Sequence, residues 1–165
     1  MDSGLIIKPQ LQQEGFSLEL VREEDLETFI WVERVSHYKY VAEHQDYFGE
    51  WNESILINAF HAKLGMTYFR KIVLQGEIVG FLGYDQKTDR IDNVFIRIVD
   101  KAQHKGIGSG FLTSLQHIAL EQGITVFLAV IKTNPAQNLY KKLGFECCKE
   151  QDVFRFFTYP APCSA

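Results

Sequence analysis

Residues 103–110 combine side-chain and backbone groups that are suited to holding an anion. The run Gln-His-Lys-Gly-Ile-Gly-Ser-Gly follows an apolar segment, 94–99, and precedes an amphipathic one. This order predicts a strand, a tight turn and a helix start, where the first N–H groups lack carbonyl partners and carry partial positive charge. Gly106 and Gly108 let a phosphate approach the backbone closely, and Lys105 adds a cation. The sequence therefore predicts a phosphate-bearing ligand at this turn.

Two common phosphate-binding motifs do not match this turn. The dinucleotide fingerprint places its glycines in the first strand-to-helix turn of a Rossmann-like alternation. Here the turn comes late, after segments that read as antiparallel strands. The Gly-Lys-Ser/Thr ending of a P-loop is also missing. The turn alone thus predicts an anion site without identifying the ligand.

A second motif lies at residues 134–145, with the sequence Asn-Pro-Ala-Gln-Asn-Leu-Tyr-Lys-Lys-Leu-Gly-Phe. Together the two motifs resemble the GNAT superfamily of acyl-CoA-dependent N-acetyltransferases. That family carries Arg/Gln-x-x-Gly-x-Gly/Ala after its central strand, followed by Asn-x-x-Ala/Gln, Tyr and Leu-Gly-Phe. The resemblance covers residues 90–146, whereas residues 1–65 match only in outline, in the part where family members differ by substrate.

The resemblance implies that acetyl-CoA is the co-substrate and that it lies in a splay between strands at 90–99 and 124–131. Backbone groups of Ile98 and Val99 would pair with the pantetheine amides, and Asn134 would reach the pantetheine arm. The expected pyrophosphate contacts are Gln103, His104, Lys105, Gly106, Ile107, Gly108 and Ser109. Many relatives have arginine where this chain has Lys105, which keeps the charge but loses the forked donor geometry.

The resemblance also implies that Tyr140 faces the sulfur of the cofactor. A phenolic O–H is a suitable donor for a departing thiolate. Its helical spacing from Ala136 and Gly144 is equally that of a packed core residue, so both interpretations stay open. Neither motif contains a cysteine that could carry the acyl group, which favours direct transfer in a ternary complex.

The acceptor amine must lose a proton before it attacks, because a free alkyl amine has a pKa near ~10. Asp92 falls where histone-type relatives carry a glutamate base. It is one methylene shorter, which suggests a proton relay through water. His37, Glu43 and His44 are competing candidates, since His37 and His44 would share a helical face with Tyr40. Ordinary structural roles for both histidines stay open.

Aromatic and acidic residues alternate through residues 31–53. The hypothesis that they bind a cationic small-molecule acceptor rests on cation–π and charge contacts. Its candidate substrate residues are Trp31, Tyr40, Glu43 and Trp51. The alternative is a helix pair that uses its aromatics for the core and its acids for solubility.

The elements that must position these residues alternate between strands and helices. Hydrophobic periodicity predicts strands near 16–20, 69–74, 78–84, 90–99, 124–131, 145–149 and 153–159. It predicts helices over about 22–35, over 37–64 in two pieces broken near 48–49, over 107–122 and over 135–143. The strand at 124–131 is almost continuously apolar, which is typical of a strand covered on both faces beside a parallel neighbour.

We therefore predict an α/β fold with a GNAT-like mixed, mostly antiparallel central sheet, a splayed central strand pair and flanking helices. A length of 165 residues favours a single domain. Within it, residues 1–14 would be a loose lead-in with at most a short strand. Residues 24–65 would form variable acceptor-side helices, and residues 90–146 the acetyl-CoA-binding core.

Composition narrows the class of protein. A net charge of −4 argues against broad nucleic-acid binding. No signal-peptide pattern or apolar run near ~20 residues is evident. Cys147, Cys148 and Cys163 show no metal-ligand spacing, so we expect reduced thiols, no metal and a cytoplasmic protein. Sheet edges and the aromatic segment 154–159 are compatible with a homodimer.

The function expected from the sequence is transfer of an acetyl group from acetyl-CoA to a primary amine of a small molecule. Three alternatives stay open. The enzyme could transfer a longer acyl group, or it could modify a protein N-terminus or lysine. The domain could also be a non-catalytic acyl-CoA sensor, although the intact motif residues argue against a degenerate site.

Overall fold

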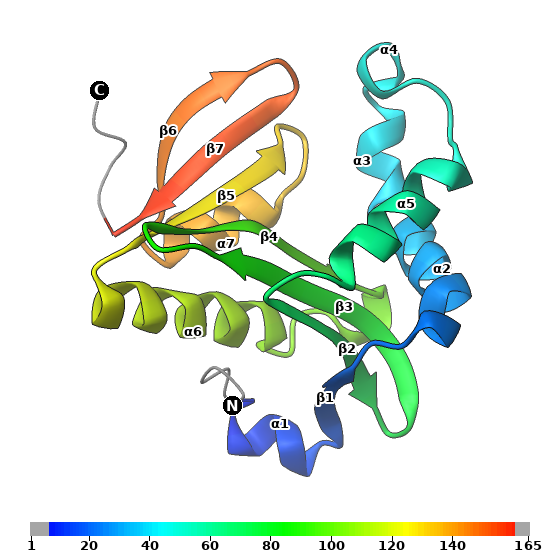
Figure 1. The fold of residues 1–165 in the computed structure, drawn as a ribbon, viewed down its shortest axis with the longest axis horizontal. Coiled ribbons are helices and arrows are strands. Elements are labelled where there is room, and N and C mark those ends of the chain that lie inside the picture. Colours follow the sequence, from blue (N-terminus) through cyan, green and yellow to red (C-terminus); the bar gives the residue numbers. More distant parts are fainter. Residues whose placement is uncertain (1–6, 161–165) are drawn as a thin grey trace. The chain divides into compact units, whose positions relative to one another are not determined.

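The computed structural model describes residues 7–160 (Figure 1). The strands are β1 (Phe16–Leu20), β2 (Tyr68–Leu74), β3 (Glu77–Gln86), β4 (Arg90–Ile98), β5 (Thr125–Ile131), β6 (Glu146–Gln151) and β7 (Phe154–Tyr159). The α-helices are α1 (Pro9–Gln13), α2 (Leu26–Ser36), α3 (Tyr38–Ala42), α4 (Gln45–Phe48), α5 (Glu53–Lys63), α6 (Ile107–Gln122) and α7 (Ala136–Lys142). Short 3-10 turns, η1 (Glu23–Asp25) and η2 (Asp100–Ala102), precede α2 and follow β4.

The strands form one seven-stranded sheet in the order β1-β2-β3-β4-β5-β7-β6. The pairs β1–β2, β2–β3, β5–β7 and β6–β7 are antiparallel, and β4–β5 is parallel. This confirms the mixed, mostly antiparallel sheet expected from the sequence. The described chain divides into two compact units: an N-terminal unit of residues 7–84 with 95–107, and a C-terminal unit of residues 85–94 with 108–160.

The N-terminal unit is built around an aromatic core. Figure 1 shows α2 and α5 side by side. Rings from these helices and from β2, β3 and β4 contact one another with centroids 5.3–6.2 Å apart, namely Phe29, Phe60, Phe69, Phe81 and Phe95. Such offset and edge-on pairs add to the burial of the rings themselves.

Glycine at one turn and at one close approach shapes this unit. Gln75 and Gly76 both have positive φ and close the two-residue hairpin between β2 and β3, which begins one residue earlier than the strand predicted at 78–84. Gly80 of β3 lies so close to β4 that a Cβ there would clash with the carbonyl oxygen of Arg97. Only glycine therefore allows this spacing of β3 and β4 at Arg97.

In the C-terminal unit, α6 connects β4 to its parallel neighbour β5. Arg90 and Ile91 of β4 pair with Thr125 and Val126 of β5. The buried face of α6 carries Phe111, Leu112, Leu115 and Ala119, which confirms the predicted amphipathic pattern. Gly123, with φ +66, ends the helix as expected.

Three expectations from the sequence are wrong. Residues 9–13 form a helix, because Pro9 occupies a first-turn position where its missing N–H costs nothing. The first helical piece after 37 is split into α3 and α4 at His44, in addition to the expected break at Gly49. Strand β5 alternates, since Val126, Leu128 and Val130 are buried while Ala129 is exposed, so it is not covered on both faces.

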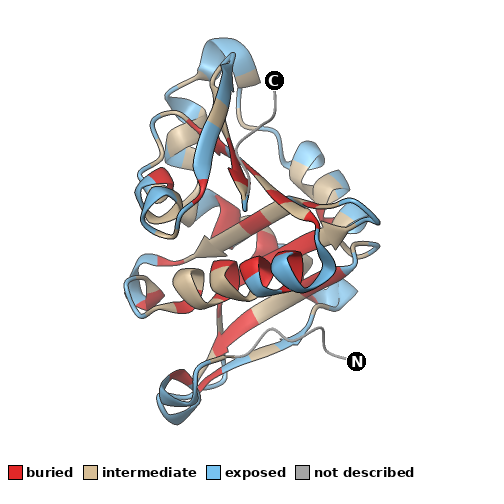
Figure 2. Ribbon diagram, turned by 90° about the vertical axis from the view of Figure 1, so that its left-hand side faces the viewer, coloured by how far each residue is buried: buried red, intermediate tan, exposed pale blue. Residues whose placement is uncertain are grey.

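Figure 2 shows how burial follows this architecture, with buried residues concentrated along the strands and exposed ones on turns and outer helix surfaces. Strand β6, the last in the sheet order, is exposed along most of its length. Within residues 7–160, no helix is both long and apolar enough to cross a membrane.

Candidate functional site

The turn before α6 has the open backbone geometry expected of an anion site. His104 and Gly106 both adopt positive φ, +61 and +91, so the chain reverses sharply just before the helix begins at Ile107. A Cβ built on Gly106 or on Gly110 would meet no atom within 4 Å. The backbone at these two glycines is therefore open to a ligand, and Lys105, before Gly106, is exposed. The first N–H groups of the sixteen-residue helix that follows have no carbonyl partner within the helix.

Gln103 connects this turn to the end of β4. Its side-chain Nε2 donates to the carbonyl oxygen of Ile98 at 2.8 Å. Val99 N–H donates to the carbonyl of Val79 on β3 at 2.9 Å. Because backbone groups of alternate strand residues point in opposite directions, Ile98 presents its N–H and carbonyl away from β3. The structure thus leaves Ile98, and not the Val99 N–H, as the backbone group of this pair that could meet a ligand.

Asn134 stands at the start of α7. Its Oδ1 accepts a hydrogen bond from the N–H of Ala136 at 2.9 Å, so it caps the helix. Pro135 follows with helical φ and ψ of −69° and −8°. Since the cap uses the oxygen of the Asn134 amide, the NH₂ end of that amide is the part suited to bind a ligand.

Gln137 holds the turn that carries Asn134. It is only 8% exposed, and its Nε2 donates to the carbonyls of Lys132 and Asn134 at 2.7 and 3.1 Å. Its Oε1 accepts from Arg155 of β7 at 2.6 Å. The sequence motif contains this residue, but only the structure shows that it fixes the turn.

Tyr140 is half-buried on α7. Its ring packs edge-on against Phe157, with centroids 5.6 Å apart, and lies 6.2 Å from Phe145. These contacts anchor the ring in the C-terminal unit. The ring of Tyr140 is therefore a packed residue, as one of the two interpretations has it. A chemical role for its hydroxyl group is compatible with this packing.

Asp92 lies on β4 beside a backbone irregularity, because its neighbour Asn93 has φ +51. One carboxylate oxygen, Oδ2, accepts from Lys87 Nζ at 2.8 Å. The other, Oδ1, is buried and receives no hydrogen bond from any residue that the structure describes. A buried carboxylate oxygen without a donor is costly to fold around, and such groups recur at functional sites.

The other base candidates fare differently. Burial, and then the positive charge of Arg97, lower the pKa of His37 from 6.5 to about 2, which makes its imidazole a poor proton acceptor. His44 precedes α4 and so does not continue the helical face of His37 and Tyr40, although those two rings stay in contact at 6.1 Å. Glu43 is exposed after α3.

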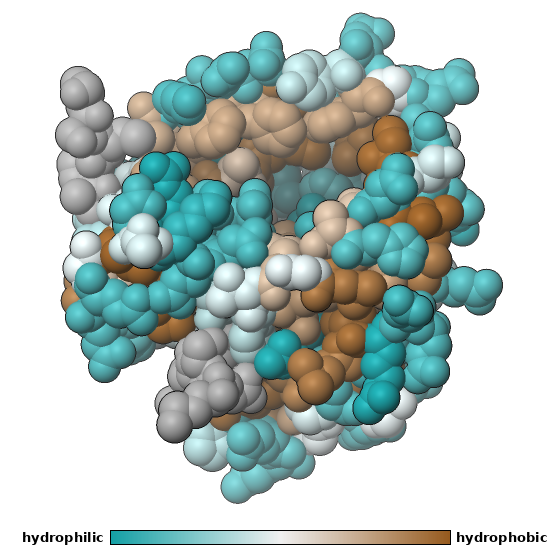
Figure 3. All heavy atoms as spheres, viewed as in Figure 1, coloured by the Kyte–Doolittle hydropathy of each residue, from teal (hydrophilic) through white to brown (hydrophobic). Residues whose placement is uncertain are grey.

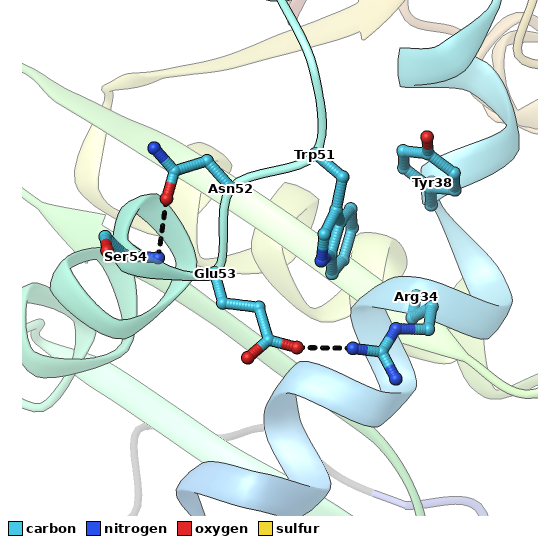
Figure 4. A pocket seen from close by; sticks show the side chains of 6 residues that line it. All are labelled: Arg34, Tyr38, Trp51, Asn52, Glu53 and Ser54. Carbon is cyan, nitrogen blue, oxygen red and sulfur yellow. Dashed lines mark hydrogen bonds and ion pairs between the residues drawn. The ribbon is translucent and has the colours of Figure 1, made fainter.

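A surface pocket of about 620 Å³ lies between α2, α3 and the start of α5 (Figure 4). It is lined by Arg34, Tyr38, Trp51, Asn52, Glu53 and Ser54. The rings of Tyr38 and Trp51 meet edge-on at 4.7 Å. Arg34 lies 5.4 Å from the Trp51 ring centroid and pairs with Glu53. The cation position beside this tryptophan and carboxylate is therefore already filled by the protein's own arginine.

The remaining substrate candidate on α2 faces outward. Trp31 is 46% exposed, and Val35, one turn later, is 42% exposed. Hydrophobic residues also reach the surface over α5 (Figure 3), where Ile55 is 59% exposed. The four predicted substrate residues thus do not form one cluster: Trp51 lines the pocket, Tyr40 contacts His37, and Trp31 and Glu43 face solvent.

Sequence reasoning missed an ion pair on the inner face of α2. Glu33 is buried there, on the same helix face as Phe29 and Val32, and pairs with Arg97 of β4 at 3.2 Å. Both residues carried a signal. Glu33 is an acid on an apolar helix face, and Arg97 is the one charged residue of the apolar segment 94–99.

The division of the chain separates the motif residues. Asp92, Gly108, Ser109, Asn134 and Tyr140 belong to the C-terminal unit. The remaining candidates, from Trp31 to Trp51 and from Ile98 to Ile107, belong to the N-terminal unit. Among the described residues, no three or more His, Cys, Asp or Glu side chains gather as metal ligands would.

A mixed, mostly antiparallel sheet flanked by helices is the fold of GNAT acyltransferases, and the chain is an acyltransferase. The family model described as "Acetyltransferase (GNAT) family" matches residues 18–145, and the chain belongs to this family. GNAT enzymes bind acetyl-CoA and an acceptor substrate. Among curated proteins, none matches the chain by sequence.

Solved structures share the fold. PaiA N-acetyltransferase from Thermoplasma acidophilum in complex with coenzyme A is 20% identical, with TM-score 0.62, over 87% of this chain and 98% of that one. Naa50 from Arabidopsis thaliana, in complex with a bisubstrate analogue, is 16% identical, with TM-score 0.62, over 89% and 99%. Ard1 from Thermoplasma volcanium is 18% identical, with TM-score 0.60, over 87% and 95%.

Proposed function

We propose that this enzyme transfers the acetyl group of acetyl-CoA to a primary amine of a small molecule, by direct attack in a ternary complex. The observation that carries the proposal is the turn before α6, where Gly106 adopts φ +91 beside open space. A pyrophosphate suits this turn, because unpaired helix N–H groups and Lys105 supply donors and charge.

The other proposed cofactor contacts come from the same turn, from the end of β4 and from the start of α7. Gln103, His104, Ile107, Gly108 and Ser109 would surround the pyrophosphate, and the outward backbone of Ile98 would pair with a pantetheine amide. Pairing of Ile98 requires its carbonyl to accept beside, or in place of, Gln103 Nε2. The amide NH₂ of Asn134 would donate to the pantetheine arm.

The chemistry needs one proton removed and one supplied. The neutral amine attacks the thioester carbonyl, the C–S bond breaks, and the nitrogen loses a proton. We assign removal of that proton to Asp92, through water, because its buried Oδ1 has an unfilled acceptor site. The hydroxyl of Tyr140 would give a proton to the departing thiolate.

Calorimetric titration with acetyl-CoA and with CoA tests this function. We expect micromolar binding by the wild type and loss of binding by Gly108→Trp, which fills the turn. Glu121→Trp, an exposed change near the far end of the same helix, is the control and should bind as the wild type does. Failure of the correctly folded wild type to bind either ligand would overturn the proposal.

Two further properties expected from the sequence stay proposals. The cytoplasmic location rests on the three cysteines, whose spacing is typical of reduced thiols. A homodimer is supported by the exposed strand β6 at the end of the sheet order, because an edge strand has unpaired backbone groups. Sedimentation of the protein at several concentrations tests the second property.

A further inference from the structure

The ion pair between Glu33 and Arg97 is asymmetric in its exposure. Arg97 Nε lies 3.2 Å from Glu33 Oε1 and 3.3 Å from Oε2, and its Nη1 donates to the carbonyl of Ile96 at 3.1 Å. The Glu33 side chain is 9% exposed and that of Arg97 is 23% exposed. The cation is thus the half of the pair that a ligand can reach.

The outer edge of the Arg97 guanidinium is uncommitted. A guanidinium presents its N–H donors as a planar fork that fits a carboxylate with two parallel hydrogen bonds. Here Nε and Nη1 are used by Glu33 and Ile96, and no residue that the structure describes accepts from Nη2. Glu33 holds the guanidinium through Nε and leaves Nη2 free to donate.

The positive charge of Arg97 acts on His37, whose imidazole is neutral. His37 follows α2, one turn after Glu33. The backbone N–H of His37 donates to the backbone carbonyl of Glu33 at 3.0 Å. Burial and the charge of Arg97 keep the pKa of its imidazole near 2. An uncharged imidazole offers one N–H donor and adds no compensating negative charge. The more accessible half of the ion pair is therefore the N–H donor, Arg97, and not the carboxylate.

The pocket lined by Tyr38 and Trp51 does not favour the cationic acceptor expected from the sequence. A cationic acceptor would need the aromatic and acidic groups of the pocket, but Arg34 already occupies the face of Trp51 and pairs with Glu53. At the Glu33–Arg97 cluster, the more exposed group is the guanidinium, which offers a cation no hydrogen-bond acceptor.

The position of Arg97 connects the cluster to the reaction. Arg97 directly precedes Ile98, the residue whose backbone points away from β3. The backbone of Arg97 itself lies close to Gly80 of β3. We propose that Arg97, assisted by His37, binds a carboxylate of the acceptor, so that the preferred acceptors are amines carrying a carboxylate, such as amino acids. This inference rests on the proposed acetyltransferase function.

Matched acceptor pairs test the proposal. Each pair consists of an L-amino acid and its amide, for example leucine and leucinamide, assayed by release of CoA from acetyl-CoA. The amide form loses its amine proton more easily, so intrinsic reactivity favours the amide. We expect the wild type to prefer the acids by roughly 10- to 100-fold in kcat/KM, the range for a hydrogen bond to a charged group. Arg97→Gln should abolish this preference, chiefly through KM.

Three further variants separate binding from folding. Arg97→Lys keeps the charge without the fork and should retain part of the preference. His37→Asn should reduce it by a smaller factor. Lys71→Gln breaks a comparable ion pair, with Asp25 at 2.9 Å and side chains 13% and 8% exposed, and should lower stability while leaving the preference intact.

Short peptides separate two sources of the carboxylate. In peptides with amidated C-termini, glutamate and glutamine are compared at the second position. A preference confined to free amino acids places the carboxylate on the amine-bearing residue, and a preference for the glutamate peptide places it on a neighbouring side chain.

The outcomes distinguish this inference from the function beneath it. Equal or better use of the amides by a wild type that binds acetyl-CoA would overturn the carboxylate proposal and leave acetyl transfer intact. An unchanged preference in Arg97→Gln, or no turnover of any carboxylate-bearing amine, would do the same. Absence of acetyl-CoA binding would overturn the proposed function itself.

Discussion

Two polar networks in this protein differ in how completely their hydrogen bonds are used. In the C-terminal unit, the Nε2 of Gln137 donates to two backbone carbonyls, and its Oε1 accepts from Arg155. Arg155 also donates to Glu150 at 2.7 Å. In the N-terminal unit, the Arg97 guanidinium keeps an unused edge beside Glu33. A closed network fixes a loop, whereas an open one leaves donors for a ligand.

The same contrast exists inside the C-terminal unit, on a smaller scale. Asp92 uses one oxygen with Lys87 and leaves the other buried without a donor among the described residues. Asn134 uses the oxygen of its amide as a helix cap. Satisfied groups shape the site, and the unsatisfied ones are those to which we assign binding or proton transfer.

Tyr140→Phe gives the largest expected effect, because it removes the hydroxyl group and keeps the ring against Phe157. We expect kcat to fall by roughly 10³-fold, within the range for general acid catalysis, with little change in acetyl-CoA affinity. Steady-state kinetics and calorimetry measure the two quantities. Tyr159→Phe makes the same deletion on β7 and should leave kcat near the wild-type value. A similar kcat in both variants would restrict Tyr140 to packing.

Asp92→Asn comes next, with an expected loss of about 10²-fold in rate at neutral pH. The deficit should shrink at high pH, where the acceptor amine deprotonates without help. A pH–rate profile from pH 6 to 10 measures this. Asp89→Asn, at an exposed carboxylate that Arg90 pairs at 3.2 Å, is the control. A profile for Asp92→Asn that matches the wild type would remove Asp92 from the mechanism.

Gln137→Leu tests whether the closed network is structural. It removes the donor to two backbone carbonyls and the acceptor of Arg155 Nη1, while Arg155 Nε keeps Glu150. We expect the free energy of unfolding to fall by about 2–3 kcal/mol. Acetyl-CoA affinity should also weaken, because the Asn134 turn loses its anchor. Urea denaturation gives the first quantity. Asn138→Ala, at the exposed neighbour on α7, should cost much less; equal losses would contradict the network.

His37→Gln tests the open network through pH. The unfolded chain binds a proton at His37 below pH 6.5, whereas the folded protein does so only near pH 2, so stability falls as pH drops below 6.5. The slope from this residue is at most ~1.4 kcal/mol per pH unit. Unfolding at pH 6.5 and pH 5 should show a flatter dependence in His37→Gln. His117→Gln, at an exposed site on α6, should keep the wild-type slope.

Much of the fold could be predicted because its signals are local. The hairpin at Gln75–Gly76, the cap at Asn134 and the stop at Gly123 each depend on neighbours within a few residues. The predicted break of the helical region near Gly49 was confirmed for the same reason. The additional break at His44 was missed, because no glycine or proline marks it.

The phosphate-suited turn and the family were therefore contained in the sequence, since both depend on residue types at fixed short spacings. The cluster of Glu33 with Arg97 was not, because its members are 64 positions apart and meet only when α2 packs on the sheet. The sequence showed that aromatic and acidic residues alternate before β2, and only the tertiary structure showed that Arg34 fills their cation position. Which donors remain unused is decided by packing, because any polar group finds or loses its partner only when distant segments come together.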